Sequence, residues 1–223
     1  MKVAIVIPAF NEEDTIIQVV NDIKNYGKPI VVDDCSTDGT YARCLSENIS
    51  VIHHSVNLGY DAALQSGFEH AFRLGVDIII TMDADGQHTS KELEKILYPL
   101  LNNKAEMVLG VRSNGFARIS ERVFSAYTQL RFGVNDILCG IKGYKIDLYL
   151  MHGCFDSIKS IGTELALASL RRGVNFQQVE VLMYPRIKGK ARFGGWLSSN
   201  LHIFRAFLFA VWADIRNSRD FNE

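Results

Sequence analysis

The chain has 223 residues, of which 48% are hydrophobic and 22% are charged, so it can bury a core without disulfide bonds or an obligatory partner. Its formal net charge of −1 argues against a general nucleic-acid-binding protein. The apolar stretch after Lys2 is too short for a secretory signal peptide, and no apolar run reaches the roughly 20 residues that a membrane-spanning helix needs. The cysteines and histidines show no metal-binding spacing, and we expect reduced thiols in a cytosolic protein.

Strand-like and helix-like segments alternate through the first half of the chain, which predicts βαβ units and a mainly parallel sheet. We expect strands at residues 2–8, 29–33, 50–53, 76–82, 106–110 and 176–183. Where apolar residues recur at helical spacing, we expect helices at residues 12–26, 62–74, 120–131 and 163–172, and another that begins near Ser90. The chain shows no repeat or linker, so we expect a single domain.

Two aspartates directly follow the most apolar of the predicted strands, in the segment TMDADGQH at residues 81–88. In open α/β sheets, ligands bind at the carboxyl ends of the strands, and hard divalent cations prefer oxygen ligands. Asp83 and Asp85 therefore indicate a site for a metal-bound diphosphate. The alternative is that both aspartates cap the helix that begins near Ser90.

A second acidic cluster follows the strand at residues 29–33. Adjacent side chains of an extended segment point to opposite sides, so we expect Asp33 and Asp34 to have different roles, one holding the loop and one facing a ligand. We assign the nucleotide contact to Asp34. We expect Asp38 to cap the following helix or to form an Asx turn.

Seven short segments occur in a recognisable order. They are PAFNE at 8–12, VVDDCSTDGT at 31–40, NLG at 57–59, DADGQ at 83–87, GVR at 110–112, CGIKGY at 139–144 and RIKGKAR at 186–192. This set, which covers residues 3–192, resembles the inverting family 2 glycosyltransferases, and among them the dolichol-phosphate mannose synthase and polyprenyl-phosphate glycosyltransferase branch.

The resemblance implies a GT-A fold, which is an α/β, Rossmann-like, mainly parallel sheet sandwiched by helices. It further implies a metal-dependent enzyme that moves a hexose from a nucleotide diphosphate sugar, of the GDP-mannose or UDP-glucose type, with inversion at the anomeric carbon. In a single domain spanning 1–223, residues 1–110 would bind the nucleotide sugar. Residues 111–195 would hold the acceptor and a basic flap, and residues 196–223 would form an apolar helix and tail.

By the same resemblance, the donor contacts are Pro8, Phe10 and Glu12 in the first loop and Val32 and Asp34 in the second. These residues would hold the base and the ribose.

The resemblance places a Mg²⁺ or Mn²⁺ ion on Asp83, Asp85 and Gln87, with Ala84 touching the donor. Two carboxylates and an amide oxygen form a suitable hard ligand set. The ion would stabilise the departing nucleoside diphosphate.

The resemblance also implies that Arg112, Arg186 and Arg192 clasp the diphosphate, which the planar fork of arginine suits. We assign catalysis to Asp83, Asp85, Arg112 and Arg186. The basic run at residues 186–192 predicts a flap, although such a run is also typical of a solvated surface. Position 191 holds alanine where the family commonly has serine.

The acceptor decides whether a general base is needed, because a lipid phosphate is already anionic whereas a sugar hydroxyl must lose a proton. For a polyprenyl or dolichyl phosphate, we expect contacts from Arg118, Arg122 or Arg131. For a hydroxyl acceptor in polysaccharide or glycoprotein assembly, Asp136 or Glu164 would be the base. A structural role for either acid, bracing a turn or a helix start, remains the alternative.

The segment at residues 196–215 is apolar over most of its surface but too short to cross a membrane. It indicates a core helix, an oligomer contact, or a helix lying in a membrane interface, which would bring the enzyme to a lipid acceptor at the cytoplasmic face of a membrane. The sequence predicts no oligomeric state. A noncatalytic nucleotide-sugar-binding subunit is the competing hypothesis, and the unusual Asp61 and Ala191 are its only support.

Overall fold

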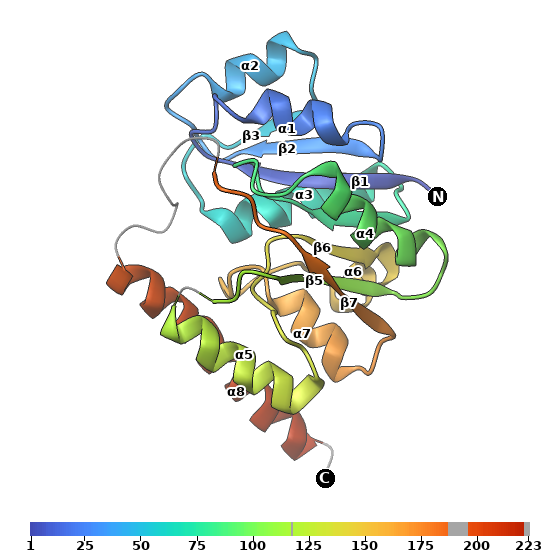
Figure 1. Cartoon of the computed structure of the whole chain (residues 1–223), viewed down its shortest axis with the longest axis vertical. Coiled ribbons are helices and arrows are strands. Elements are labelled where there is room, and N and C mark those ends of the chain that lie inside the picture. The colour runs from blue at the N-terminus through green and yellow to red at the C-terminus, as the bar shows by residue number, and fades with distance from the viewer. Residues whose placement is uncertain (117, 187–195, 221–223) are drawn as a thin grey trace.

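The computed structural model describes residues 1–116, 118–186 and 196–220. At its centre is a seven-stranded sheet in the order β3-β2-β1-β4-β6-β5-β7 (Figure 1). The strands are β1 (Val3–Ala9), β2 (Lys28–Asp33), β3 (Val51–His53), β4 (Ile78–Thr81), β5 (Met107–Arg112), β6 (Lys142–Lys145) and β7 (Phe176–Val181). Neighbouring strands are parallel except that β6 runs antiparallel to both β4 and β5. The predicted α/β fold with a mainly parallel sheet is confirmed.

Helices cover both faces of the sheet. They are α1 (Ile16–Ile23), α2 (Thr40–Ser46), α3 (Tyr60–Arg73), α4 (Ser90–Leu101), α5 (Ile119–Phe132), α6 (Ile146–His152), α7 (Glu164–Arg171) and α8 (Trp196–Asp220). Successive residues of β1 point to opposite sides. Ala4 and Val6 join the core under α3, α5, α6 and α7, whereas Ile5 and Ile7 join the core under α1 and α4.

Two elements, β6 and α6, have no counterpart in the sequence prediction, and α2 was expected only as a helix without bounds after Asp38. The strand β6 has four residues, and they include two lysines and a glycine, so no apolar alternation marks it. Gly143 is required there because a Cβ atom would lie 2.6 Å from Leu100 Cδ1 and 2.7 Å from Ile96 Cγ2. Packing against α4, which is distant in sequence, therefore buries β6 at Gly143.

The antiparallel strand β6 also shapes the edge of the sheet where the acidic loops lie. The turn before it brings Gly140 against Asp83, and a Cβ atom on Gly140 would lie 2.1 Å from Asp83 Oδ2. The hydroxyl of Thr81 donates to the carbonyl of Gly140 at 2.8 Å, which holds this turn to the end of β4.

The helices α5 and α8 pack side by side at the end of the molecule farthest from α2 (Figure 1). Ile203, Ala206 and Ala210 of α8 are buried, and the ring of Phe207 lies 5.8 Å from Phe124 and 5.5 Å from Tyr127. The described parts of the chain contain no helix that is both long and apolar enough to cross a membrane. Core packing thus uses one side of α8 and leaves the other side exposed.

Candidate functional site

A cavity of about 200 Å³ opens where β1 and β2 end and α3 begins. Its lining residues are Pro8, Ala9, Phe10, Asp34, Asn57, Gly59, Tyr60 and Ala63. Three of the predicted donor contacts, Pro8, Phe10 and Asp34, therefore share one cavity at the carboxyl edge of the sheet, as expected for a ligand site in an open α/β fold.

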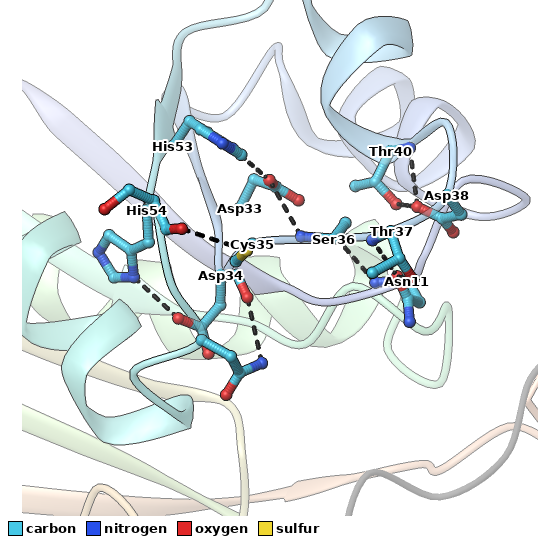
Figure 2. Close-up of polar contacts among 12 residues, drawn as sticks. Asn11, Asp33, Asp34, Cys35, Ser36, Thr37, Asp38, Thr40, His53 and His54 are labelled. Atoms are coloured by element: carbon cyan, nitrogen blue, oxygen red, sulfur yellow. Dashed lines mark hydrogen bonds and ion pairs between the residues drawn. The ribbon is translucent and has the colours of Figure 1, made fainter.

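Asp34 builds the wall of this cavity. Its carboxylate accepts the backbone N–H groups of Leu58 and Gly59, both at 2.8 Å, and lies 2.8 Å from Nδ1 of His54 (Figure 2). Its own carbonyl accepts the side-chain amide of Asn57 at 3.1 Å. Because Gly59 has a φ of 95°, which favours glycine, the NLG segment is shaped to follow this carboxylate.

Asp33 holds the loop after β2, as expected for one of the two aspartates, whereas Asp34 both holds the NLG segment and lines the cavity, so its nucleotide contact stays a prediction. Asp33 is fully buried, and its Oδ2 lies 2.7 Å from Nδ1 of His53 and accepts the N–H of Ser36 (Figure 2). The side chain of Asp38 accepts the N–H of Thr40 at 2.9 Å, which confirms its predicted role at the start of a helix.

The two aspartates after β4 are arranged differently. The hydroxyl of Tyr60 donates to Oδ1 of Asp83 at 3.3 Å, so the cavity and the second acidic loop are adjacent. Asp85 is 4% exposed and lies 3.0 Å from the guanidinium of Arg186. The N-cap residue of α4 is Thr89, and the N–H of Ser90 donates to Asp22, so neither Asp83 nor Asp85 caps that helix. Asp85 instead accepts the N–H of Gln87 at 3.0 Å within the loop.

Gln87 and His88 complete the loop after β4. The side-chain amide of Gln87 donates to the carbonyl of Tyr184 at 3.1 Å. His88 is buried, and neither of its ring nitrogens has a hydrogen-bond partner among the residues that the structure describes. Burial lowers the pKa of His88 despite the neighbouring charges of Asp83 and Asp85, so its imidazole is neutral.

This donor set fits a divalent cation. Asp83, Asp85 and Gln87 all belong to the loop after β4, and hard cations such as Mg²⁺ and Mn²⁺ prefer the oxygen ligands that these side chains offer. The guanidinium of Arg186 already places a positive charge against Asp85. A metal ion at Asp85 would therefore share this carboxylate with Arg186 or displace the guanidinium.

Arg112, which the sequence assigned to the diphosphate, is held by two acids. Its guanidinium donates to Asp136 at 2.7 Å and 3.0 Å, a bidentate contact, and to Glu121 at 3.2 Å. Burial would lower the pKa of Arg112, but the hydrogen bonds and charge of Asp136 and the charge of Glu121 raise it. A phosphate that binds Arg112 would therefore have to share the guanidinium with Asp136 and Glu121 or displace one of these carboxylates.

The predicted acceptor arginines lie along α5. Arg118, at its start, forms a capping box with Glu121, and Arg122 donates to the carbonyl of Phe116 at 3.5 Å. Arg131 lies in the last turn, about 20 Å along the helix, and pairs with Asp214 of α8 at 3.3 Å. Arg131 thus joins α5 to α8, while Arg118 shares the carboxylate of Glu121 with Arg112.

Glu164 lies apart from the cavity, at the start of α7. It contacts His152 Nε2 at 3.2 Å and accepts the N–H of Ser157 at 2.5 Å. Burial by itself would raise the pKa of Glu164, but the hydrogen bonds from His152 and Ser157 outweigh it and lower that pKa to about 2. A carboxylate of such low basicity is a poor general base.

Three other predicted donor residues do not line the cavity. Val32 and Ala84 are fully buried in the cores on the two faces of the sheet. Glu12 is buried at the start of α1, where its carboxylate accepts the hydroxyl of Thr15 at 3.1 Å. Arg192 and most of the predicted basic flap lie outside the described residues.

The prediction missed Tyr60 and Glu121, both of which contact predicted residues. Tyr60 directly follows the NLG segment, so its place at the start of α3 was the available signal. Glu121 stands three residues after Arg118, a spacing that is typical of a capping box, but its contact with Arg112 depends on how α5 meets β5.

Comparison with known proteins identifies the group to which the chain is related. Residues 4–160 match the sequence profile of Glycosyl transferase family 2. A UDP-N-acetylglucosamine–dolichyl-phosphate N-acetylglucosaminyltransferase of Methanococcus voltae is 36% identical over 128 residues, which are 48% of this chain and 51% of that protein. The matched part thus spans about half the length of that relative.

Other similarities extend over more of the chain. An undecaprenyl-phosphate mannosyltransferase of Micrococcus luteus is 25% identical over 97% of this chain and 98% of its own length. The crystal structure of glucosyl-3-phosphoglycerate synthase from Mycobacterium tuberculosis superposes with a TM-score of 0.72 at 20% identity, covering 94% of this chain and 79% of that one. The expected GT-A fold is confirmed, and the chain belongs to glycosyl transferase family 2.

Proposed function

We propose that the chain is an inverting glycosyltransferase that moves a hexose from a nucleotide diphosphate sugar to a polyprenyl phosphate. The observation that carries this proposal is the contact between Tyr60 and Asp83, because it joins the cavity of Pro8, Phe10 and Asp34 to the acidic loop after β4. The base and ribose would occupy the cavity, and the diphosphate would lie at the loop. Donors of the GDP-mannose or UDP-glucose type fit this scheme.

A divalent ion, Mg²⁺ or Mn²⁺, would be held by Asp83, Asp85 and Gln87. When bound, the ion neutralises negative charge on the departing diphosphate. Arg186 supports the same task, since its guanidinium lies within 3.0 Å of Asp85 and so beside the expected diphosphate. Its planar fork suits bidentate contact with phosphate oxygens.

A phosphate acceptor agrees with the state of the two candidate bases. Asp136 makes a bidentate pair with Arg112, and Glu164 has a pKa of about 2 and does not line the cavity. A sugar hydroxyl would need one of them to take its proton, whereas a lipid phosphate needs neither. The names of the relatives, which include dolichyl-phosphate and undecaprenyl-phosphate transferases, support the same choice. Arg118 and Arg122 are the proposed acceptor contacts.

We further propose that α5 and α8 rest on the cytoplasmic face of a membrane. The exposed apolar residues of each helix recur at helical spacing and share one face. They are Ile119, Val123 and Leu130 on α5 and Leu201, Phe204, Leu208, Trp212 and Ile215 on α8. A lipid phosphate in such a surface would meet the start of α5, where Arg118 and Arg122 lie.

The proposed reaction is tested by incubating the full chain and Mn²⁺ with a panel of nucleotide sugars, with and without polyprenyl phosphate, and identifying products by mass. We expect a glycolipid from a single hexose donor. Product that forms with a sugar hydroxyl acceptor but not with the lipid phosphate would contradict the acceptor assignment. Donor binding without turnover for any acceptor would instead indicate the noncatalytic subunit.

The membrane contact is tested with Leu208→Glu and Leu130→Glu, which place a charge on the proposed surface. Both should reduce co-sedimentation with anionic liposomes about tenfold or more, since a charge at an interfacial position opposes insertion. Leu45→Glu on α2 is the matched control, because Leu45 is similarly exposed at 52% but lies on another part of the molecule. Unchanged liposome binding by the α5 and α8 variants would contradict the proposal.

A further inference from the structure

Three side chains with different ligand atoms meet between α6 and α7. They are His152, the last residue of α6, Cys154 two residues later, and Glu164, the first residue of α7. Their ligand atoms all lie within 4.8 Å of one another, and all three side chains are partly buried. None of the three lines the cavity at the acidic loops.

The distances in this cluster match those of a tetrahedral metal site. Glu164 Oε1 lies 3.2 Å from His152 Nε2 and 3.6 Å from Cys154 Sγ. With typical zinc bond lengths and tetrahedral angles, the corresponding ligand-to-ligand distances are about 3.3 Å and about 3.5 Å. The oxygen is therefore already placed to share an ion with the nitrogen and the sulfur.

The backbone holds this arrangement. Gly153 ends α6 with a φ of 88°, a left-handed conformation that favours glycine, and this turn brings His152 and Cys154 to face the start of α7. The other carboxylate oxygen, Glu164 Oε2, accepts the N–H groups of Ser157 at 2.5 Å and Ile158 at 3.2 Å. Hydrogen bonds of this kind orient a ligating carboxylate. Glu164 Oε1 also accepts the hydroxyl of Ser157 at 3.0 Å, a contact that an ion would share through the second lone pair of this oxygen.

We propose that His152, Cys154 and Glu164 bind a Zn²⁺ ion, with water in the fourth position. A nitrogen, a thiolate sulfur and an oxygen suit a borderline-soft cation, whereas the acidic loop after β4 offers the oxygen ligands that Mg²⁺ and Mn²⁺ prefer. The two sites would therefore select different metals. Binding converts the Cys154 thiol to a zinc-bound thiolate and releases its proton to solvent.

The ion would join the end of α6 to the start of α7 and hold the loop between them. That loop contributes Lys159 and Ile161 to a second cavity of about 270 Å³, which also includes Gly59 and Tyr60. Gly59 and Tyr60 line the first cavity as well, so the two cavities are adjacent. The zinc site would thus stabilise a segment that borders the proposed donor pocket, while contributing no ligand to the donor.

The test measures Zn²⁺ retained by the full chain after dialysis against excess Mg²⁺ with a non-thiol reductant. We expect stoichiometric Zn²⁺ in the wild type, and Co²⁺ substitution should produce thiolate-to-cobalt charge-transfer absorption. Cys154→Ser should weaken Zn²⁺ binding by at least about 100-fold, and Ser157→Ala by about tenfold through the misoriented Glu164. Cys35→Ser is the matched control, since Cys35 is also partly buried but hydrogen-bonds to Ser55 elsewhere.

Two results would overturn the proposal. One is a wild-type chain that retains no Zn²⁺ and shows no cobalt charge-transfer band, which would leave a hydrogen-bonded cluster only. The other is unchanged Zn²⁺ affinity in both Cys154→Ser and His152→Gln, with circular dichroism confirming that the variants are folded. Because the assay involves no nucleotide sugar, either result would leave the proposed transferase function untouched.

Discussion

The two acidic loops at the edge of the sheet look alike in sequence but use their carboxylates differently. After β2, His54 and the N–H groups of Leu58 and Gly59 satisfy Asp34, and His53 and the N–H of Ser36 contact Oδ2 of Asp33, so both aspartates hold the loop. Oδ1 of Asp33 is buried and has no hydrogen-bond partner among the described residues. After β4, Asp85 is paired with Arg186 and accepts the backbone N–H of Gln87 at 3.0 Å, and Asp83 receives a tyrosine hydroxyl at 3.3 Å. A metal ion could replace the contacts with Arg186 and Tyr60, whereas the N–H of Gln87 holds Asp85 in the loop.

The comparison teaches that an aspartate at the end of a strand is not a functional residue by position alone. Its hydrogen-bond partners decide, because a carboxylate that accepts several buried N–H groups cannot leave them without a large cost. If this distinction is right, substitutions in the loop after β4 should impair activity with little loss of stability. Substitutions after β2 should first reduce stability.

The largest effect is expected for Asp85→Asn. Turnover should fall about 1,000-fold, equivalent to about 4 kcal/mol, because the amide removes a negative metal ligand where leaving-group charge is stabilised. The free energy of unfolding, measured in urea, should change by much less than this, because the amide oxygen can still accept the N–H of Gln87. Asp77→Asn is the control, since Asp77 precedes the same strand at its opposite end. Near-normal turnover in Asp85→Asn would contradict the metal assignment.

Arg186→Ala should have the next largest effect, because it should lower the transfer rate and raise the affinity for Mn²⁺. Transfer should fall about 100-fold, since a cation that stabilises the departing diphosphate is lost. Binding of Mn²⁺ without donor should become about threefold tighter, because the guanidinium no longer competes for Asp85. Arg73→Ala, on the exposed side of α3, is the control for charge. Weaker Mn²⁺ binding in Arg186→Ala, measured by titration calorimetry, would show that the two cations do not compete.

Asp34→Asn tests the loop after β2. The two N–H groups bind different oxygens of Asp34, so the amide would leave one part-buried N–H group without its acceptor, at a cost of about 1 kcal/mol. Urea denaturation should detect this loss, in contrast to the small change expected for Asp85→Asn. Full stability together with lost donor binding would mean that Asp34 acts on the ligand alone.

Asp61 should show the smallest effect, and one that depends on pH. Burial and the charge of Asp156 raise the pKa of Asp61 from 3.8 to about 7. The folded chain thus binds more protons than the unfolded chain between these values, so stability falls as the pH rises through this range. Asp61→Asn should be about 1 kcal/mol more stable than the wild type at pH 8, after allowing for partial exposure, and no more stable at pH 4.

Thermal unfolding at both pH values tests this prediction, with the exposed Asp147→Asn as control. A difference between Asp61→Asn and wild type that is the same at pH 4 and pH 8 would show that Asp61 does not titrate in this range.

The sequence alone determined the elements with strong local signals. Apolar runs marked β1, β2 and β4, and helical periodicity marked α3 and α5, to within a few residues. The motif order predicted the family and the loops that meet at the sheet edge. These features could be predicted because strand alternation, helix periodicity and turn chemistry depend on residues that are close in sequence.

The tertiary structure decided which groups meet. The insertion of β6 between β4 and β5, the pairing of Arg112 with Asp136 and Glu121, and the contact of Arg186 with Asp85 join residues that are distant in the chain. The cluster of His152, Cys154 and Glu164 had no sequence signature, since its third member belongs to another helix. Packing of whole elements sets these contacts, and a carboxylate acquires its role from the partners that packing brings to it.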